Sequence, residues 1–189
     1  MNLSVRQLNT FSQVEEIYTS RMMHDFGEDE IRPLSALQKF WNRGEYFCYG
    51  LYDRDELLAY AFFLGRGRHF LLDYLAVSPE HRGGGLGSVF LRELTNQFPD
   101  ADCVLVEVED PAAAQTDELR SARQRRMRFY SRNGFYDTGI ASRTFGVDYR
   151  LLNIAAEKNL SASEIREIYT GMYRSMLPRH LYEAKFFLK

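Results

Sequence analysis

Residues 77–88 read VSPEHRGGGLGS and join an apolar, strand-like run to the start of a predicted helix. Glycine has no Cβ, so a run of glycines lets the backbone approach a ligand closely. The amides at a helix N-terminus point outward and favour an anion, usually a phosphate. Arg82 adds a positive charge beside them. The stretch therefore favours a phosphate-binding turn, the alternative being a glycine-rich turn without a ligand.

Two common phosphate-binding motifs are absent from this stretch. Counted from Gly83, the P-loop pattern and the dinucleotide pattern both require a glycine where the chain has Ser88. The pattern that is present is Arg82-x-x-Gly85-x-Gly87, directly after the strand-like run. The interpretation of this turn therefore depends on that pattern and on its surroundings.

Hydrophobic periodicity around the turn predicts a mixed α+β order. Alternating or continuous apolar runs predict strands over residues 3–8, 46–52, 57–64, 70–77, 103–108, 135–140 and 145–154. Helical spacing predicts helices over residues 14–22, 33–44, 87–98, 119–132 and 161–177. Ser161 and Glu164 form a potential capping box for the last helix. The tail, residues 182–188, is either an edge strand or a packed segment.

A second motif lies downstream, where residues 129–135 read FYSRNGF. Together with Arg82-x-x-Gly85-x-Gly87, it resembles the GNAT family of N-acetyltransferases over residues 3–154. The resemblance implies a central, mostly antiparallel mixed sheet of about seven strands flanked by helices. The additional helix after residue 155 and the long link over residues 110–122 depart from the family pattern. They leave the acceptor undefined, since either could shape its pocket.

The resemblance also implies acetyl-CoA as the co-substrate and assigns residues to it. The backbone amides of the glycine stretch would bind the pyrophosphate, the preceding strand would run beside the pantetheine arm, and Tyr130 would protonate the departing thiolate. The cofactor-binding residues implied are Leu75, Ala76, Val77, Arg82, Gly83, Gly84, Gly85, Leu86, Gly87, Ser88 and Tyr130. No covalent acyl-enzyme is expected, because neither cysteine has an adjacent histidine to activate it.

Three carboxylates are candidates for the base that takes a proton from the amine. Glu107 and Glu109 share one face of the strand over residues 103–108, and Glu107 is the first candidate. Asp73 stands second, on an apolar strand face where an unpaired carboxylate is costly. The alternatives are solvated edge charges for the two glutamates and an ion pair with a nearby arginine for Asp73.

Composition excludes several classes of protein. The chain has 189 residues and a net charge of −2. Its length predicts a single domain over 1–189, with a core over 3–154 and an extension over 155–189. A nucleic-acid-binding surface usually needs an excess of basic residues, and this chain has none. The arginine run over 120–128 indicates a solvated helix face or a site for an anion. A membrane helix needs about 18 consecutive apolar residues, and the sequence has no such segment, so no membrane helix is predicted. Cys48 and Cys103 are expected to be reduced core residues of a cytoplasmic protein.

Three functions follow as hypotheses. The first is acetyl transfer from acetyl-CoA to a primary amine by direct attack in a ternary complex. The second is an inactive acyl-CoA sensor, and the third, a nucleic-acid-associated protein, is disfavoured by the net charge. The scattered histidines predict no metal site. A homodimer is common in the family, and the C-terminal helix could supply its contact.

Overall fold

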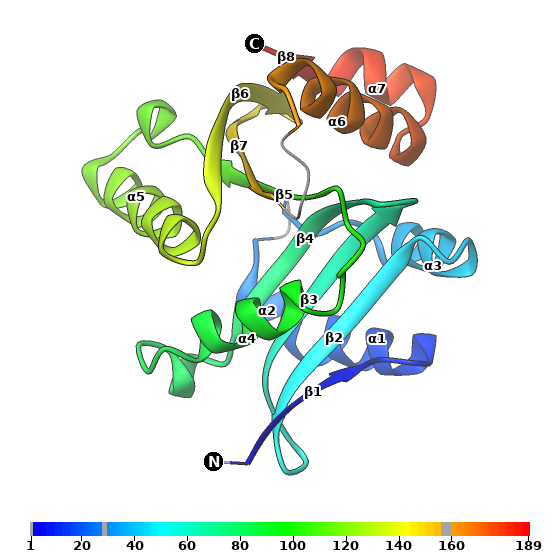
Figure 1. The fold of residues 1–189 in the computed structure, drawn as a ribbon, viewed down its shortest axis with the longest axis vertical. Coiled ribbons are helices and arrows are strands. Elements are labelled where there is room, and N and C mark those ends of the chain that lie inside the picture. Colours follow the sequence, from blue (N-terminus) through cyan, green and yellow to red (C-terminus); the bar gives the residue numbers. More distant parts are fainter. Residues whose placement is uncertain (1, 28–29, 156–159) are drawn as a thin grey trace. The chain divides into compact units, whose positions relative to one another are not determined.

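The computed structural model describes residues 2–27, 30–155 and 160–189. The chain divides into two compact units, one made of Met1–Gly65 with Leu72–Phe98 and the other of Arg66–Leu71 with Pro99–Lys189. Both units contain strands and helices, and most neighbouring strands are antiparallel (Figure 1). The mixed α+β class expected from the sequence is confirmed.

The first unit carries its strands in the order β1-β2-β3-β4. Antiparallel ladders join β1 to β2 and β2 to β3. The strands are β1 (Leu3–Gln7), β2 (Tyr46–Asp53), β3 (Glu56–Arg66) and β4 (His69–Val77). The helical elements are α1 (Phe11–Ile17), a π-helical turn (Tyr18–Met22), α2 (Met23–Asp25), α3 (Leu34–Asn42) and α4 (Leu86–Thr95).

Strands β2 and β3 are buried on both faces, which explains why their sequences are continuous apolar runs. On one face Tyr46 packs edge-to-face on Phe62, with ring centroids 5.9 Å apart. On the other face the rings of Tyr49 and Phe63 both contact Phe98, and the ring centroids of Phe63 and Phe98 are 4.9 Å apart. A strand covered on both faces shows no polar alternation, because neither side meets water.

The second unit carries its strands in the order β5-β7-β6-β8, with antiparallel ladders throughout. Figure 1 shows α5 on one side of this strand group and α6 with α7 on the other. The strands are β5 (Cys103–Glu109), β6 (Tyr136–Thr144), β7 (Val147–Ala155) and β8 (Phe186–Leu188). The helices are α5 (Asp117–Arg132), α6 (Ala162–Met176) and α7 (Arg179–Lys185), and a 3₁₀ turn covers Pro111–Ala113.

Several predicted boundaries differ from the structure. Pro33 is the N-cap of α3 rather than its first helical residue. Phe145 was expected to begin a strand, but it has φ of 49° and forms the β6–β7 turn with Gly146. Two successive positive φ values give a tight hairpin whose twist matches its strands. The tail contains the helix α7 before the strand β8, which adds an eighth described strand to the expected seven.

The capping box and the burial of the two cysteines agree with the expectations from the sequence. Ser161 caps α6, its hydroxyl accepting from the Glu164 amide while the Glu164 carboxylate accepts from the Ser161 amide. Cys48 and Cys103 are free thiols buried in the two cores. Burial raises the pKa of Cys103 to about 12, so this thiol stays protonated at neutral pH. Among the helices described, none has the length and apolar character to cross a membrane.

Candidate functional site

The glycine stretch forms an open turn that leads into α4. Gly83 and Gly85 have φ of +83° and +82°, a left-handed conformation that side chains with a Cβ rarely adopt. Gly85 is the N-cap of α4. A Cβ added at Gly83 or Gly85 would meet no atom within 4 Å. The glycines are therefore required by the backbone conformation, and no described atom of the protein lies where these Cβ atoms would stand.

The amides of this turn are available hydrogen-bond donors. Ser88 and Val89 donate to the Gly85 carbonyl over 3.0 and 3.1 Å, as the first turn of α4 closes. The amides of residues 83–87 find no acceptor among the described residues. Consecutive free donors at the positive end of a helix dipole form an anion site. The turn thus has the chemistry that the sequence predicted for a phosphate.

The side chain of Arg82 holds the turn in place. Its Nε donates to the carbonyl of Val77 over 2.9 Å, and its Nη2 lies 2.9 Å from Oδ1 of Asp25 in α2. Asp25 in turn accepts from the Tyr60 hydroxyl over 3.0 Å. These contacts tie the turn to the end of β4 and to α2. A contact between Arg82 and a pyrophosphate stays a prediction.

The strand β4 ends with Leu75, Ala76 and Val77, within the strand that the sequence predicted. Ala76 is buried, whereas Leu75 and Val77 are half-buried. Ser78 then leaves the strand, its amide donating to the Leu58 carbonyl over 2.8 Å. The strand therefore leads directly into the glycine turn. Whether its residues pair with a pantetheine arm stays a prediction.

Asp73 is held in an ion pair. Arg32 donates from Nε to both carboxylate oxygens, over 3.1 and 3.2 Å, and the Tyr46 hydroxyl donates to Oδ2 over 2.8 Å. The Asp73 side chain is 8% exposed. This is the paired alternative considered for Asp73 from its sequence, and it occupies both oxygens. The ion pair favours the structural alternative for Asp73, and its role as a base stays a prediction.

Glu107 projects from β5 towards the C-terminal helix α6. Tyr169 donates its hydroxyl proton to Oε1 of Glu107. The hydroxyl oxygen of Tyr173 lies 2.8 Å from both Oε1 and Oε2 of Glu107. Phenols that donate to a carboxylate favour its charged form. The carboxylate thus has defined partners from a helix that the family resemblance did not cover.

Glu109 is neutralised by α5. Arg123 lies 2.8 Å from Oε1 of Glu109, and Arg126 binds Oε2. Arg120 pairs with Asp117 within the same helix. Part of the arginine run thus binds carboxylates of the chain itself, which makes Glu109 the weakest of the three base candidates.

Tyr130 lies near the end of α5, in an aromatic group. Its ring packs against Phe129 and Phe135 with centroids 5.1 and 5.4 Å away. Burial raises the pKa of Tyr130 above its usual value, and the nearby Arg126 charge opposes part of that rise. No described residue accepts from or donates to its hydroxyl. The phenol therefore keeps its proton at neutral pH and can donate it to a ligand atom.

Sequence reasoning missed the partners of these carboxylates. Arg32 and Asp25 lie in a polar segment with no motif, and no sequence signal identifies them. Tyr169 and Tyr173 stand four residues apart on the apolar face of the last predicted helix, where the pattern indicates core positions. They are buried as the pattern predicts, but their hydroxyl groups point to Glu107. Only the fold shows that β5 lies beneath them.

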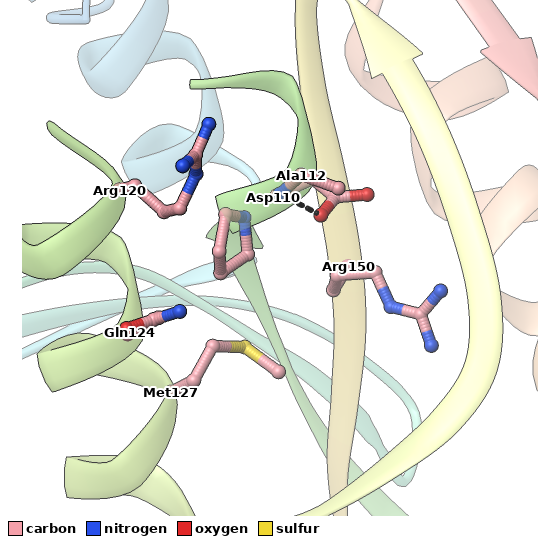
Figure 2. A pocket seen from close by; sticks show the side chains of 7 residues that line it. Asp110, Ala112, Arg120, Gln124, Met127 and Arg150 are labelled. Atoms are coloured by element: carbon pink, nitrogen blue, oxygen red, sulfur yellow. Dashed lines mark hydrogen bonds between the residues drawn. The ribbon is translucent and has the colours of Figure 1, made fainter. Parts of the chain in front are cut away.

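A hollow of about 420 Å³ lies between the 3₁₀ turn, α5 and β7 (Figure 2). Its charged side chains already have partners. Arg150 pairs with Asp137, Arg120 with Asp117, and Asp110 caps the turn by accepting from the Ala112 amide. The hollow contains none of the predicted catalytic or cofactor-binding residues, although part of its lining belongs to the link over residues 110–122, and we assign it no ligand. The described residues hold no cluster of His, Cys, Asp and Glu suited to a metal ion.

A comparison with known proteins finds a family that matches this sequence. A family model described as the acetyltransferase (GNAT) family matches residues 11–135. That range includes the glycine turn, Glu107 and Tyr130, and it ends before α6. No curated protein matches the sequence.

Solved structures share the fold at low sequence identity. A GNAT-family structure from Bacteroides thetaiotaomicron has a TM-score of 0.67 and 21% identity, covering 88% of this chain and 93% of that one. The ribosomal-protein-S18-alanine N-acetyltransferase of Escherichia coli has a TM-score of 0.59 and 16% identity, with 84% and 96% covered. Spermidine N-acetyltransferase of Vibrio cholerae, in complex with CoA and spermine, has a TM-score of 0.56 and 16% identity, with 83% and 97% covered.

Proposed function

Since this chain belongs to the GNAT acetyltransferase family, we propose that it transfers an acetyl group from acetyl-CoA to a primary amine. The proposed reaction is a direct attack of the amine on the thioester within a ternary complex. The observation that carries the proposal is the family match over the glycine turn, whose five amides at residues 83–87 lack acceptors in the described protein.

Acetyl-CoA fits the donors of this turn. The pyrophosphate of the co-substrate is an anion, and the free amides before α4 offer it hydrogen bonds without a competing side chain. Arg82 would hold the turn in shape and add positive charge. Leu75, Ala76 and Val77 would run beside the pantetheine arm, whose amides can pair with a strand.

Glu107 is the proposed base. An amine with a pKa near that of lysine, about 10.4, is mostly an ammonium ion at neutral pH and has no free electron pair. A carboxylate can take the extra proton, directly or through a water molecule, before the nitrogen attacks. Support comes from its position within the family match and from its two phenolic donors, which orient the carboxylate.

Tyr130 is the proposed acid. As the new C–N bond forms and the C–S bond breaks, the sulfur leaves with the electron pair of that bond, and the nitrogen, which is positively charged after the attack, loses a proton to solvent. The Tyr130 hydroxyl would then transfer its proton to the sulfur, and solvent would later return a proton to the phenolate. Support comes from its raised pKa, which keeps the phenol protonated, and from the absence of a described partner for its hydroxyl.

The acceptor is not specified by these residues. The related enzymes act on substrates as different as spermidine and a protein alanine, at identities that carry the fold alone. We therefore propose the class, a primary amine, and expect the long link and the C-terminal helix to shape the acceptor pocket. A homodimer through the C-terminal helix is a further expectation from the family.

A thiol-release assay tests the proposal. The full chain is incubated with acetyl-CoA and a panel of polyamines, amino acids, aminoglycosides and peptides, and the free thiol is measured with a colorimetric reagent. Acetylated product is verified by mass spectrometry. Release with at least one amine supports the enzyme. Calorimetric binding of acetyl-CoA with no turnover on any amine would instead support an acyl-CoA sensor, and the absence of binding would contradict both.

A further inference from the structure

A second hollow lies where α6 ends and α7 begins. It has a volume of about 350 Å³ and is lined by Arg174, Arg179, Tyr182 and Glu183. Arg174 comes from the last turn of α6, whereas the other three stand three and four residues apart on one face of α7. Small-molecule sites in proteins begin at about 300 Å³, so the hollow has room for a small organic ligand.

Arg174 is held over an aromatic ring rather than by a carboxylate. Its Cζ lies 5.6 Å from the ring centroid of Tyr182, within the range of a cation–π contact. Tyr182 in turn stacks on the buried Phe186, with ring centroids 5.4 Å apart. No residue in the described parts of the chain accepts a hydrogen bond from the guanidinium of Arg174 or forms an ion pair with it. The stack therefore positions a guanidinium at the hollow with its N–H donors unused.

The other lining groups add to this excess of donors. Arg179 donates from Nε to Oε1 of Glu183 over 2.8 Å, which neutralises the carboxylate of the lining. The Tyr182 hydroxyl has no hydrogen-bond partner among the residues that the structure describes. Residues 161–189 carry five basic and three acidic side chains, although the whole chain has a net charge of −2. The hollow thus lies in a locally positive part of a weakly acidic protein, which favours an anion.

The larger hollow beside α5 differs in this respect. There Arg120 pairs with Asp117, and Arg150 pairs with Asp137. A paired arginine has to give up its carboxylate before it binds another anion. Arg174 has no such partner to lose, so an anion that enters the second hollow gains its hydrogen bonds without breaking an ion pair.

We propose that the hollow between α6 and α7 is a binding site for a small organic anion, whose carboxylate or phosphate group is bound by Arg174. Arginine binds both groups through two parallel N–H···O hydrogen bonds. The Tyr182 hydroxyl is the second donor, and Arg179 adds positive charge. All these residues lie outside the range 11–135 that the family model matches, and none has a part in the proposed acetyl transfer. The inference therefore does not rest on the proposed function.

A local readout at Arg174 tests the proposal in the full chain without acetyl-CoA. Arginine is labelled with ¹⁵N, and the Nε–Hε resonance of Arg174 is assigned by its loss in Arg174→Gln. Inorganic phosphate and citrate are then titrated separately, with sodium chloride keeping the ionic strength constant. Because the resonance belongs to Arg174, it reports on this hollow even where phosphate also binds the glycine turn.

We expect the Arg174 resonance to shift to saturation with at least one probe, with a dissociation constant of about 1 mM or lower. Saturation by phosphate alone identifies a phosphate-bearing ligand, and saturation by citrate alone identifies a carboxylate-bearing one. Arg125 of α5 is the matched control, because it is exposed, has no partner among the described residues and lines neither hollow. Its resonance, assigned through Arg125→Gln, should not saturate.

Two variants of α7 compare equal changes in charge. Arg179→Gln and Lys185→Gln each remove one positive charge from the helix, but only Arg179 lines the hollow. Arg179→Gln also leaves Glu183 without its ion pair beside the bound anion, so we expect the affinity to fall about tenfold. Lys185→Gln should bind as the wild type does. Tyr182→Phe keeps the ring under Arg174 and removes the hydroxyl, which should weaken binding severalfold.

A shift at Arg174 that stays linear with both probes, or an equal response at Arg125, would overturn the inference, because either result is an unspecific effect of salt. Equal affinities of Arg179→Gln and Lys185→Gln would also refute it. The Arg179 side chain is 90% exposed, so its replacement should leave the fold intact, and this variant decides if Tyr182→Phe does not fold. The acetyl-transfer assay is independent of these outcomes, so a failure here leaves the proposed function standing.

Discussion

Arg82 and Asp25 form an ion pair of 2.9 Å that fastens the glycine turn to α2. The Asp25 side chain is 9% exposed, whereas that of Arg82 is 55% exposed. Arg82 also donates to the carbonyl of Val77, the last residue of β4 before the turn. The arginine of the glycine motif thus shapes the backbone whose amides are proposed to bind the pyrophosphate.

The first prediction separates this fastening role from a direct phosphate contact. If Arg82 acts through Asp25, Arg82→Ala and Asp25→Ala should each weaken acetyl-CoA binding by a similar factor, about five- to tenfold. The double variant should be little worse than either, because both single changes remove the same contact. Isothermal titration of the three variants measures this. Additive losses, with Arg82→Ala far the larger, would indicate that the guanidinium binds phosphate.

The second prediction concerns the free amides. Gly85→Glu places a negative side chain in the open space of the turn, at a φ of +82° that a Cβ disfavours by roughly 1–2 kcal/mol. We expect acetyl-CoA affinity to fall by at least about tenfold. Gly67→Glu is the control, since Gly67 also has a positive φ and open space but lies in the β3–β4 turn. Equal affinities of the two variants would contradict the assignment of the turn.

The third prediction concerns Tyr130. Tyr130→Phe keeps the ring in its aromatic group and removes the hydroxyl, so we expect kcat to fall at least about tenfold, or about 1.4 kcal/mol in barrier. Acetyl-CoA affinity should change little. Tyr52→Phe serves as control, because Tyr52 stacks with Arg6 in the first unit. Since burial raises the pKa of Tyr130, its deprotonation should not limit the rate between about pH 6 and 9. Wild-type turnover in Tyr130→Phe would refute its role as the acid.

The fourth prediction distinguishes the two carboxylates. Glu107→Gln should abolish most turnover, and because its amide oxygen can still accept from a tyrosine of α6, it should destabilise the protein less than Asp73→Asn does. Asp73→Asn should instead destabilise the protein by about 1–3 kcal/mol, because the part-buried Arg32 loses a charged partner. Urea unfolding and steady-state kinetics of both variants separate the effects. A larger loss of kcat in Asp73→Asn, at full stability, would transfer the role of base to Asp73.

The fifth prediction concerns alkaline stability. Burial, followed by the charge of a neighbouring aspartate, raises the pKa of Tyr46 and of Tyr60. Because the folded pKa exceeds the unfolded value of about 10, the stabilisation is complete below about pH 10 and is lost as the pH rises further. The urea midpoint should therefore fall steeply above that pH. Tyr60→Phe should flatten the decline, and full tyrosine ionisation near pH 10 in the folded protein would contradict it.

Much of the fold could be predicted from local patterns. The glycine motif, the periodicity of α5 and α6, and the capping box at Ser161 all depend on interactions within a few residues of one another. Backbone conformations of this kind are set by sterics and local hydrogen bonds, which the sequence displays directly. The tail was ambiguous because Pro178 permits a helix to start there, while the residues after it also suit a strand.

The partners of the candidate site could not be predicted in this way. Asp73 and Arg32 are 41 residues apart, and Glu107 and Tyr173 are 66 apart. No periodicity in the sequence relates such positions.

The sequence by itself determined the family, the glycine turn and the set of candidate carboxylates, because these are properties of short segments. The tertiary structure alone decided which carboxylates are held by arginines and which one by two phenols. A charge or a hydrogen bond acts over a few ångströms, so the environment of a titrating group depends on what the fold brings beside it. Glu107 therefore differs from Asp73 and Glu109 through α6, a helix that begins 55 residues after it in the chain.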